Sequence, residues 1–249
     1  MTAFQKALQL NGNNFASYLG LALGYFNIGK YRDCIASLVK AERMARTPKD
    51  QYQLYRTRGA AYFNVKDFEN AAQDLLKANS IQRVSFQDVL QLGISYFRLG
   101  NLTEAEKYLR QAVALNGASA EARRYVAQLG YAQAVKAIEG KDYEQASALL
   151  TSHLANNPED AAAWFNLGLA RLFSNDLKGA EDAFAQSVRL DPDNWRGYDR
   201  LGYIYEKTKN YRKALQNYSK ASGLSQNALC KASVERVQER LRREKQGSS

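Results

Sequence analysis

Few side chains in this sequence are of the types that do chemistry. The 249 residues include one histidine, His153, and two cysteines, Cys34 and Cys230. Metal centres and nucleophile–base pairs need several such groups at set spacings, and no HExxH, paired CxxC, GxSxG or Gly-rich phosphate-binding motif occurs. The carboxylates of Glu181-Asp182 are adjacent on an expected helix, where neighbouring side chains point to different sides. We therefore expect no enzyme activity, no metal and no cofactor.

The histidine and the cysteines have simpler structural interpretations. His153 stands where a small residue is usual in the pattern described below, so we expect a packed or partly exposed imidazole rather than a catalyst. Cys34 and Cys230 lie far apart in the sequence and are expected to be small buried residues that do not meet.

The elements that position these residues are revealed by an internal repeat. One stretch contains Trp164, Leu167-Gly168, Ala180 and Phe184, and 34 positions later a second contains Tyr198, Leu201-Gly202, Ala214 and Tyr218. Small residues at fixed positions let two helix backbones approach closely, and the aromatic residues fill the space between helix pairs. A fixed period of this length indicates a solenoid of stacked helix pairs.

The same register can be followed over the whole chain, which we expect to form one solenoid over 1–249. It predicts a half repeat at 1–14, full repeats at 15–48, 52–85, 86–119, 127–160, 161–194 and 195–228, a capping helix at 229–245 and a tail at 246–249. Lys49–Gln51 are extra residues between two repeats. Because a half repeat exposes a packing face that a cap would cover, we expect the chain to be a fragment of a longer protein.

Local irregularities make further predictions. Ala120–Val126 are extra residues without Gly or Pro, which favours one long helix from about Ala120 to Glu139 with Ser119 as its N-cap. In the turns between paired helices, Gly29, Gly100 and Gly140 are expected to take the positive φ of a helix C-terminus. The capping helix is predicted to bury one stripe, formed by Leu229, Ala232, Val237 and Leu241.

On these residues the chain resembles the tetratricopeptide repeat family over about 1–245. The resemblance implies an all-α fold, a right-handed solenoid of helix-turn-helix units with a C-terminal capping helix. It also implies a non-enzymatic protein–protein interaction scaffold, in which the first helices of the repeats line a concave groove. A peptide or an amphipathic helix of a partner protein would bind there, within a larger multiprotein assembly.

Carrying the family's groove positions onto this sequence gives a predicted peptide-binding groove. From the first three full repeats it takes Leu19, Leu23, Phe26, Asn27, Arg56, Phe63, Asn64, Leu90, Gln91, Ile94, Phe97 and Arg98. From the last three it takes Tyr131, Val135, Phe165, Asn166, Leu169, Arg196, Arg200 and Tyr203. Many of these residues are Leu, Ile or Phe, and an apolar groove of this kind predicts that the bound partner segment is apolar as well. The alternative is tighter winding, in which these side chains contact one another.

Part of this set also resembles a carboxylate clamp. Some family members hold a C-terminal carboxylate with residues of two repeats, and Asn166, Arg196 and Arg200 match the distal half of that clamp. Tyr131 and Val135 stand where the proximal half has Lys and Asn, so the clamp is incomplete. The trio suits an acidic side chain or a carboxylate of the partner, held by charge-assisted hydrogen bonds.

Charge suggests a second function. The net charge is +10, and Lys and Arg exceed Asp and Glu by eight in 195–249 and by six in 1–119, whereas acidic residues exceed basic ones by four in 120–194. The chain would then bind nucleic acid or an anionic surface through the basic C-terminal repeat and cap. The cations concerned are Arg196, Arg200, Lys207, Lys209, Arg212, Lys213, Arg242 and Arg243. These charges would otherwise lie on solvated helix faces.

The sequence contains no apolar run long enough for a transmembrane segment and no visible signal peptide. The cytoplasm is favoured as the compartment, and the periplasm stays open. Partner identity and oligomeric state are also left open by the sequence.

Overall fold

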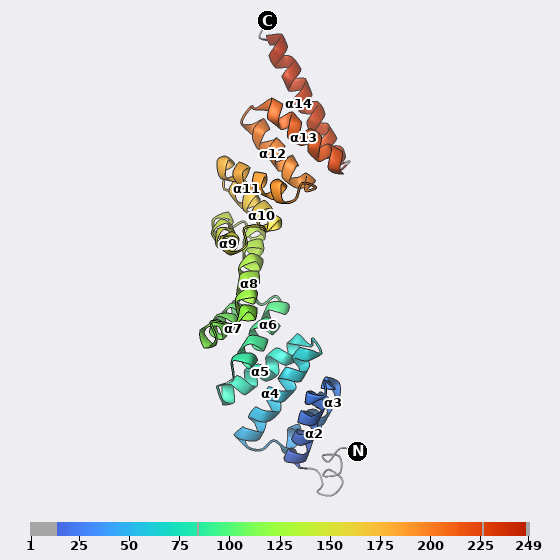
Figure 1. Cartoon of the computed structure of the whole chain (residues 1–249), viewed down its shortest axis with the longest axis vertical. Helices are drawn as coiled ribbons and strands as arrows, with labels where there is room; N and C mark the ends of the chain where they lie inside the picture. Colours follow the sequence, from blue (N-terminus) through green and yellow to red (C-terminus); the bar gives the residue numbers. More distant parts are fainter. Residues whose placement is uncertain (1–13, 84, 226, 248–249) are drawn as a thin grey trace. The chain divides into compact units, whose positions relative to one another are not determined.

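In the computed structural model, the described residues 14–83, 85–225 and 227–247 form α-helices joined by short turns (Figure 1). No strand occurs within those ranges, and the all-α fold class is confirmed. The helices are α2 (Phe15–Asn27), α3 (Tyr31–Ala41), α4 (Pro48–Asn64), α5 (Phe68–Ile81), α6 (Phe86–Arg98), α7 (Leu102–Leu115), α8 (Ala120–Glu139), α9 (Tyr143–Asn156), α10 (Ala161–Phe173), α11 (Leu177–Leu190), α12 (Trp195–Lys207), α13 (Tyr211–Ser225) and α14 (Ala228–Gly247). A short 3₁₀ turn, Glu42–Met44, follows α3.

The chain divides into two compact units, 1–129 and 130–249. Unit 1 contains α2 to α7 and the first half of α8, and unit 2 contains the second half of α8 and α9 to α14. The predicted half repeat at 1–14 lies outside the described residues except for Asn14, which caps α2 by accepting the Ser17 amide at 2.8 Å. That 1–249 forms a single solenoid stays a prediction.

One position in every helix pair takes a left-handed conformation. Gly29 and Gly100 do so with φ of 75°, as predicted, and the non-glycine residues at the same position are Lys66, Lys141, Asn175 and Lys209. The prediction for Gly140 is wrong, because the next residue, Lys141, is the one with positive φ (63°). The turn geometry is therefore set by the repeat register, even where a side chain must occupy the left-handed region.

The start of α4 differs from the predicted repeat boundary. Thr47 and Asp50 form a capping box, in which the Asp50 amide donates to Thr47 Oγ1 at 3.1 Å and the Thr47 amide donates to Asp50 Oδ2 at 3.4 Å. Pro48 takes the first helical position, where its missing N–H costs no hydrogen bond. The supposedly extra residues Lys49–Gln51 thus belong to the first turn of α4.

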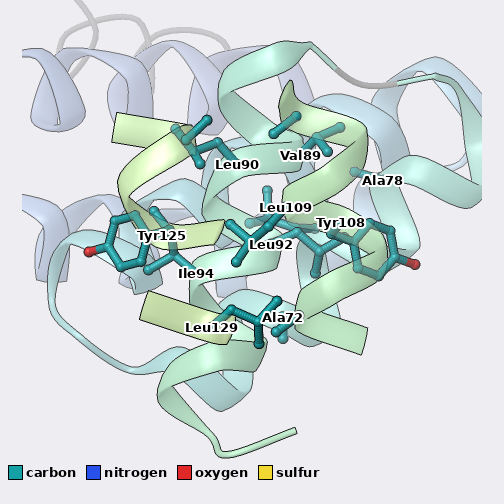
Figure 2. Packing of buried hydrophobic residues seen from close by; sticks show 14 residues of the cluster. Ala72, Ala78, Val89, Leu90, Leu92, Ile94, Tyr108, Leu109, Tyr125 and Leu129 are labelled. Atoms are coloured by element: carbon teal, nitrogen blue, oxygen red, sulfur yellow. The ribbon is translucent and has the colours of Figure 1, made fainter. Parts of the chain in front are cut away.

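The predicted long helix is confirmed in its bounds and its cap. α8 runs over Ala120–Glu139, and Ser119 Oγ accepts the Ala122 amide at 3.2 Å. Its first half buries Ala122, Tyr125 and Leu129 in the core of unit 1. Figure 2 shows Tyr125 and Leu129 among the core residues of α6 and α7.

The capping helix differs from its prediction in extent and in rotation about its axis. α14 continues to Gly247, so residues 246 and 247 of the predicted tail are helical. Leu229 is 76% exposed and Ala232 is exposed as well, so these two do not belong to the buried stripe. The residues of α14 that lie in or against the core are Cys230, Val234, Val237 and Leu241. Their spacing follows one helix face more closely than the predicted stripe did. None of the helices in the described ranges has the length and apolarity needed to cross a bilayer.

Candidate functional site

The groups that could do chemistry are engaged in packing. His153 Nε2 lies 2.9 Å from Asp160 Oδ2, and the imidazole lies against the Tyr131 ring with centroids 5.4 Å apart. Cys34 and Cys230 are buried and free, and burial raises the pKa of the Cys34 thiol to about 12. Within the described ranges, no three His, Cys, Asp or Glu side chains are grouped so as to hold a metal.

Three predicted groove residues of unit 1 are not accessible to a partner. Leu90, Gln91 and Ile94 are 0%, 8% and 3% exposed. Figure 2 shows Leu90 and Ile94 in the same cluster as Tyr125 of α8, whose first half covers this part of α6. The lengthened α8 thus shares a core with Leu90 and Ile94, and none of the three residues is accessible to a partner.

The other predicted residues of unit 1 mostly contact their own chain. Rings at the ends of first helices pack edge-on against rings of other helices, with centroids 5.3 Å apart for Phe26–Tyr31, 5.8 Å for Phe63–Phe68 and 6.1 Å for Phe97–Tyr125. Arg56 is paired with Asp88 at 2.7 Å, between α4 and α6. Leu19 is half-buried, and the exposed members are Leu23, Asn27, Asn64, Arg98 and the paired Arg56. In unit 1 these contacts are made with residues outside the predicted groove set, so they reduce its accessible surface but are not the mutual contacts of the winding alternative.

In unit 2 the predicted residues remain partly exposed. Tyr131, Val135, Phe165, Asn166, Leu169 and Arg200 are half-buried, Arg196 is exposed and Tyr203 is 36% exposed. We call these eight residues the unit-2 face. Phe165 and Leu169 of α10 pack against the cluster that contains Leu201 and Ile204 of α12, so the two helices share a core beneath the face.

The predicted clamp trio is only partly free. Asn166 Nδ2 donates to the Tyr131 hydroxyl at 2.8 Å, which joins α10 to α8, and burial raises the pKa of Tyr131. The Arg196 guanidinium lies 5.1 Å from the Trp195 ring centroid. Within the described part of the chain, neither Arg196 nor Arg200 has a carboxylate partner. Two uncompensated cations, four residues apart on α12, thus remain available for an anionic group.

A second feature near this face was missed by the sequence reasoning. Arg236 of α14 makes a two-pronged pair with Glu206 of α12, with Nε–Oε1 and Nη2–Oε2 distances of 3.0 and 2.8 Å. The Tyr218 hydroxyl donates to Glu206 at 3.1 Å, and Arg240 lies 3.7 Å away. The hydrogen bond from Arg236 holds the pKa of Glu206 below its ordinary value, against the effect of burial. The sequence signal was Glu206 at a position where the five earlier full repeats have an apolar residue, Phe in the first three and then Ile138 and Leu172.

Glu206, Arg236 and Arg240 of this cluster help to line a pocket of about 470 Å³, which we call the basic pocket. Its lining residues are Tyr203, Glu206, Lys207, Lys209, Tyr211, Arg236 and Arg240. Four cations face one carboxylate, so the pocket carries a net positive charge that favours anions. Tyr203 belongs both to the pocket and to the unit-2 face, which makes the two surfaces continuous in α12.

Acidification is expected to loosen the attachment of α14. Because the folded-state pKa of Glu206 lies below the ordinary value of 4.5, its carboxylate stabilises the fold above that value. This contribution is lost as the pH falls through the lowered pKa. Protection factors of the α14 amides, which correct for the pH dependence of intrinsic exchange, should therefore fall at acid pH, and Glu206→Gln should lower them already at neutral pH. Unchanged exchange in that variant would contradict the role of Glu206.

Comparison with known families and proteins supports the repeat assignment. A tetratricopeptide repeat family model matches residues 131–194 and 167–228, and a second one matches residues 86–129. Hsp70-Hsp90 organizing protein 3 of Arabidopsis thaliana is 26% identical over 229 residues, which are 86% of this chain and 37% of that protein. Anaphase-promoting complex subunit 3 of Schizosaccharomyces pombe is 21% identical over 197 residues, 68% of this chain and 30% of that protein.

One of the proteins that this chain matches is named as an enzyme. Human Protein O-mannosyl-transferase TMTC3 is 24% identical over 187 residues, 71% of this chain but 20% of that protein. The chain spans little more than a third of the length of the organizing proteins that it matches.

Solved structures show the same fold. MamA from AMB-1 aligns with a TM-score of 0.52 at 20% identity, over 72% of this chain and 93% of that one. The residues matched by the family models, 86–129 and 131–228, include the helix pairs from α6 to α13. The chain belongs to the tetratricopeptide repeat family.

Proposed function

We propose that this chain is a non-enzymatic protein-interaction scaffold, and that the unit-2 face holds a segment of a partner protein. The observation that carries the proposal is the pair of uncompensated arginines, Arg196 and Arg200, on the same helix as the exposed Tyr203. Partly exposed Phe165 and Leu169 on α10 add apolar surface. Such a combination suits a peptide or an amphipathic helix that carries both apolar side chains and a carboxylate.

The relatives support a role in a larger assembly. Two of them are named for organizing Hsp70 and Hsp90 and for the anaphase-promoting complex, and those roles belong to those proteins. For this chain we propose the general part only, a scaffold within a multiprotein complex. The transferase name of TMTC3 belongs to a protein of which this chain matches 20%, and among the described residues no three His, Cys, Asp or Glu side chains are grouped so as to hold a metal ion.

Charge reversal on the face is expected to weaken partner capture strongly. Arg196→Glu with Arg200→Glu places two carboxylates where the partner's acidic group would bind, and should lower capture at least about tenfold, the effect of 1.4 kcal/mol. The measurement is quantitative affinity capture with crosslinking, from cells that produce the protein. Phe165→Asp tests the apolar half of the face in the same assay.

The matched control is Arg189→Glu, an exposed arginine of α11 outside the face. Circular dichroism should show that every variant keeps its helix content. If all the face variants captured the same partners as the parent protein, at the same yield, the unit-2 face would not be the binding surface.

The alternative, nucleic-acid or anionic-surface binding, has a narrower basis. Arg242 and Arg243 both lie near Glu239, at 3.9 and 2.9 Å, so part of the charge of α14 is compensated within the helix. The basic pocket is the observation that favours this function, because it places Lys207 and Lys209 beside Tyr203 and Tyr211. A polynucleotide titration over a salt series decides it, since phosphate binding must weaken steeply with salt.

A further inference from the structure

The last full repeat carries a second pocket that shares no residue with the unit-2 face or with the basic pocket. It has a volume of about 610 Å³ and is lined by Tyr198, Tyr205, Lys213, Gln216, Asn217 and Lys220. We call it the α13 pocket. Its two tyrosines come from α12 and its polar residues from α13.

Two lysines give this pocket its charge. Lys213 Nζ lies 5.1 Å from the Tyr205 ring centroid, and Lys220 Nζ lies 5.9 Å from that of Tyr198. The rings position both ammonium groups without neutralising them. In the described ranges neither lysine has a carboxylate within ion-pair distance. The lysines are seven residues apart on α13, so they share a face and are separated by about 10.5 Å along the helix axis.

The remaining polar groups favour an acceptor-rich ligand. The Tyr205 hydroxyl donates to Glu181 Oε1 at 2.8 Å, so this hydroxyl is not available to a ligand, and Glu181 keeps its charge beside the Tyr205 ring. Burial, together with this hydrogen bond, raises the pKa of Tyr205 to about 12, so its hydroxyl stays neutral. Asn217 Nδ2 donates to the Lys213 carbonyl at 2.9 Å, whereas the Gln216 amide makes no hydrogen bond with a described residue. Gln216 can therefore donate to a bound backbone.

We propose that the α13 pocket binds an acidic, proline-containing peptide segment in the polyproline II conformation, with carboxylates at positions i and i+3. This conformation has three residues per turn and a rise of about 3.1 Å, so side chains three residues apart share a face about 9.3 Å apart. That spacing matches the two lysines. Pockets lined by aromatic side chains are the usual sites for such segments, because the extended conformation is already favoured before binding.

The test uses two peptides of equal composition. One carries Asp-Pro-Pro-Asp between serines, and the other carries Asp-Asp-Pro-Pro between the same serines. Fluorescence anisotropy at low ionic strength should show binding of the first peptide, and binding of the second should be about fivefold weaker or more because only one carboxylate reaches a lysine. Lys213→Gln and Lys220→Gln should each weaken binding of the first peptide by about tenfold.

Lys231→Gln is the matched control, because Lys231 is an exposed lysine of α14 outside the pocket. It should leave the affinity unchanged, and melting curves should show that all three variants are folded. Three results would overturn the proposal: no binding of either peptide, equal affinity for both, or unchanged binding when Lys213 and Lys220 are both replaced. If a single-stranded oligonucleotide bound more tightly than the first peptide, and if that binding depended on the same two lysines, the ligand of the α13 pocket would be nucleic acid and not a peptide.

Discussion

Arg58→Ala is expected to lower the free energy of unfolding of unit 1 by about 3–5 kcal/mol, because it leaves a buried carboxylate without a cation. Arg58 is 6% exposed and Asp74 is 3% exposed. The Arg58 guanidinium donates to both oxygens of Asp74, at 2.6 and 3.1 Å. It also donates to both oxygens of Glu42, at 2.8 and 3.1 Å. Burial alone would lower the pKa of Arg58, but the two carboxylates outweigh it and raise the pKa.

Urea unfolding followed by circular dichroism measures this loss, and amide hydrogen exchange of α4 and α5 assigns it to unit 1. The control is the double variant Arg58→Leu with Asp74→Ala. Leu167 and Ala183 occupy the corresponding positions of repeat 161–194. The double variant therefore replaces the ion pair by two apolar residues that this fold already has at the same positions. It should be much closer to the parent protein than Arg58→Ala alone. A loss below about 1 kcal/mol for Arg58→Ala would show that water or a rearrangement compensates Asp74.

The Arg58 cluster also shows where sequence reasoning ends. Helix pairs, their turns and the bounds of α8 follow from local signals, such as the repeat period and Ser119 before a stretch without proline. A buried arginine with carboxylates on α5 and in the turn after α3 follows from no local rule. It depends on three chain segments meeting, and the sequence shows only an unusual arginine at a position where Leu is common.

The candidate site was predicted unevenly for the same reason. The residues of the unit-2 face are half-buried or exposed in the structure, because helix periodicity fixes which side of a helix a residue occupies. That they bind a partner stays a prediction. Whether Leu90 and Ile94 stay accessible depends instead on where α8 packs. The pairing of Glu206 with Arg236 likewise depends on the rotation of α14 about its axis, and the predicted stripe had that rotation wrong.

Phe184→Ala is expected to cost unit 2 about 3–5 kcal/mol, the range for removing a fully buried aromatic ring. Phe184 is 0% exposed and contacts the Phe165 ring, with centroids 5.4 Å apart. A Cβ built on Gly168 would lie 2.6 Å from ring atoms Cδ1 and Cε1 of Phe184. The ring therefore fills the space that glycine leaves between α10 and α11, and its removal opens a cavity beneath Phe165 of the unit-2 face.

The opposite change at this contact gives a sharper test. Gly168→Ala gains about 1 kcal/mol of helix propensity but should lose about 1–3 kcal/mol through overlap with the ring. Gly223→Ala in α13 is the matched control, since a Cβ there meets no atom within 4 Å, and it should stabilise the helix by about 1 kcal/mol. Both are measured by urea unfolding. When Phe184→Leu makes room, Gly168→Ala should become less harmful, and a cost unchanged in that background would show that the ring does not set the approach of α10 to α11.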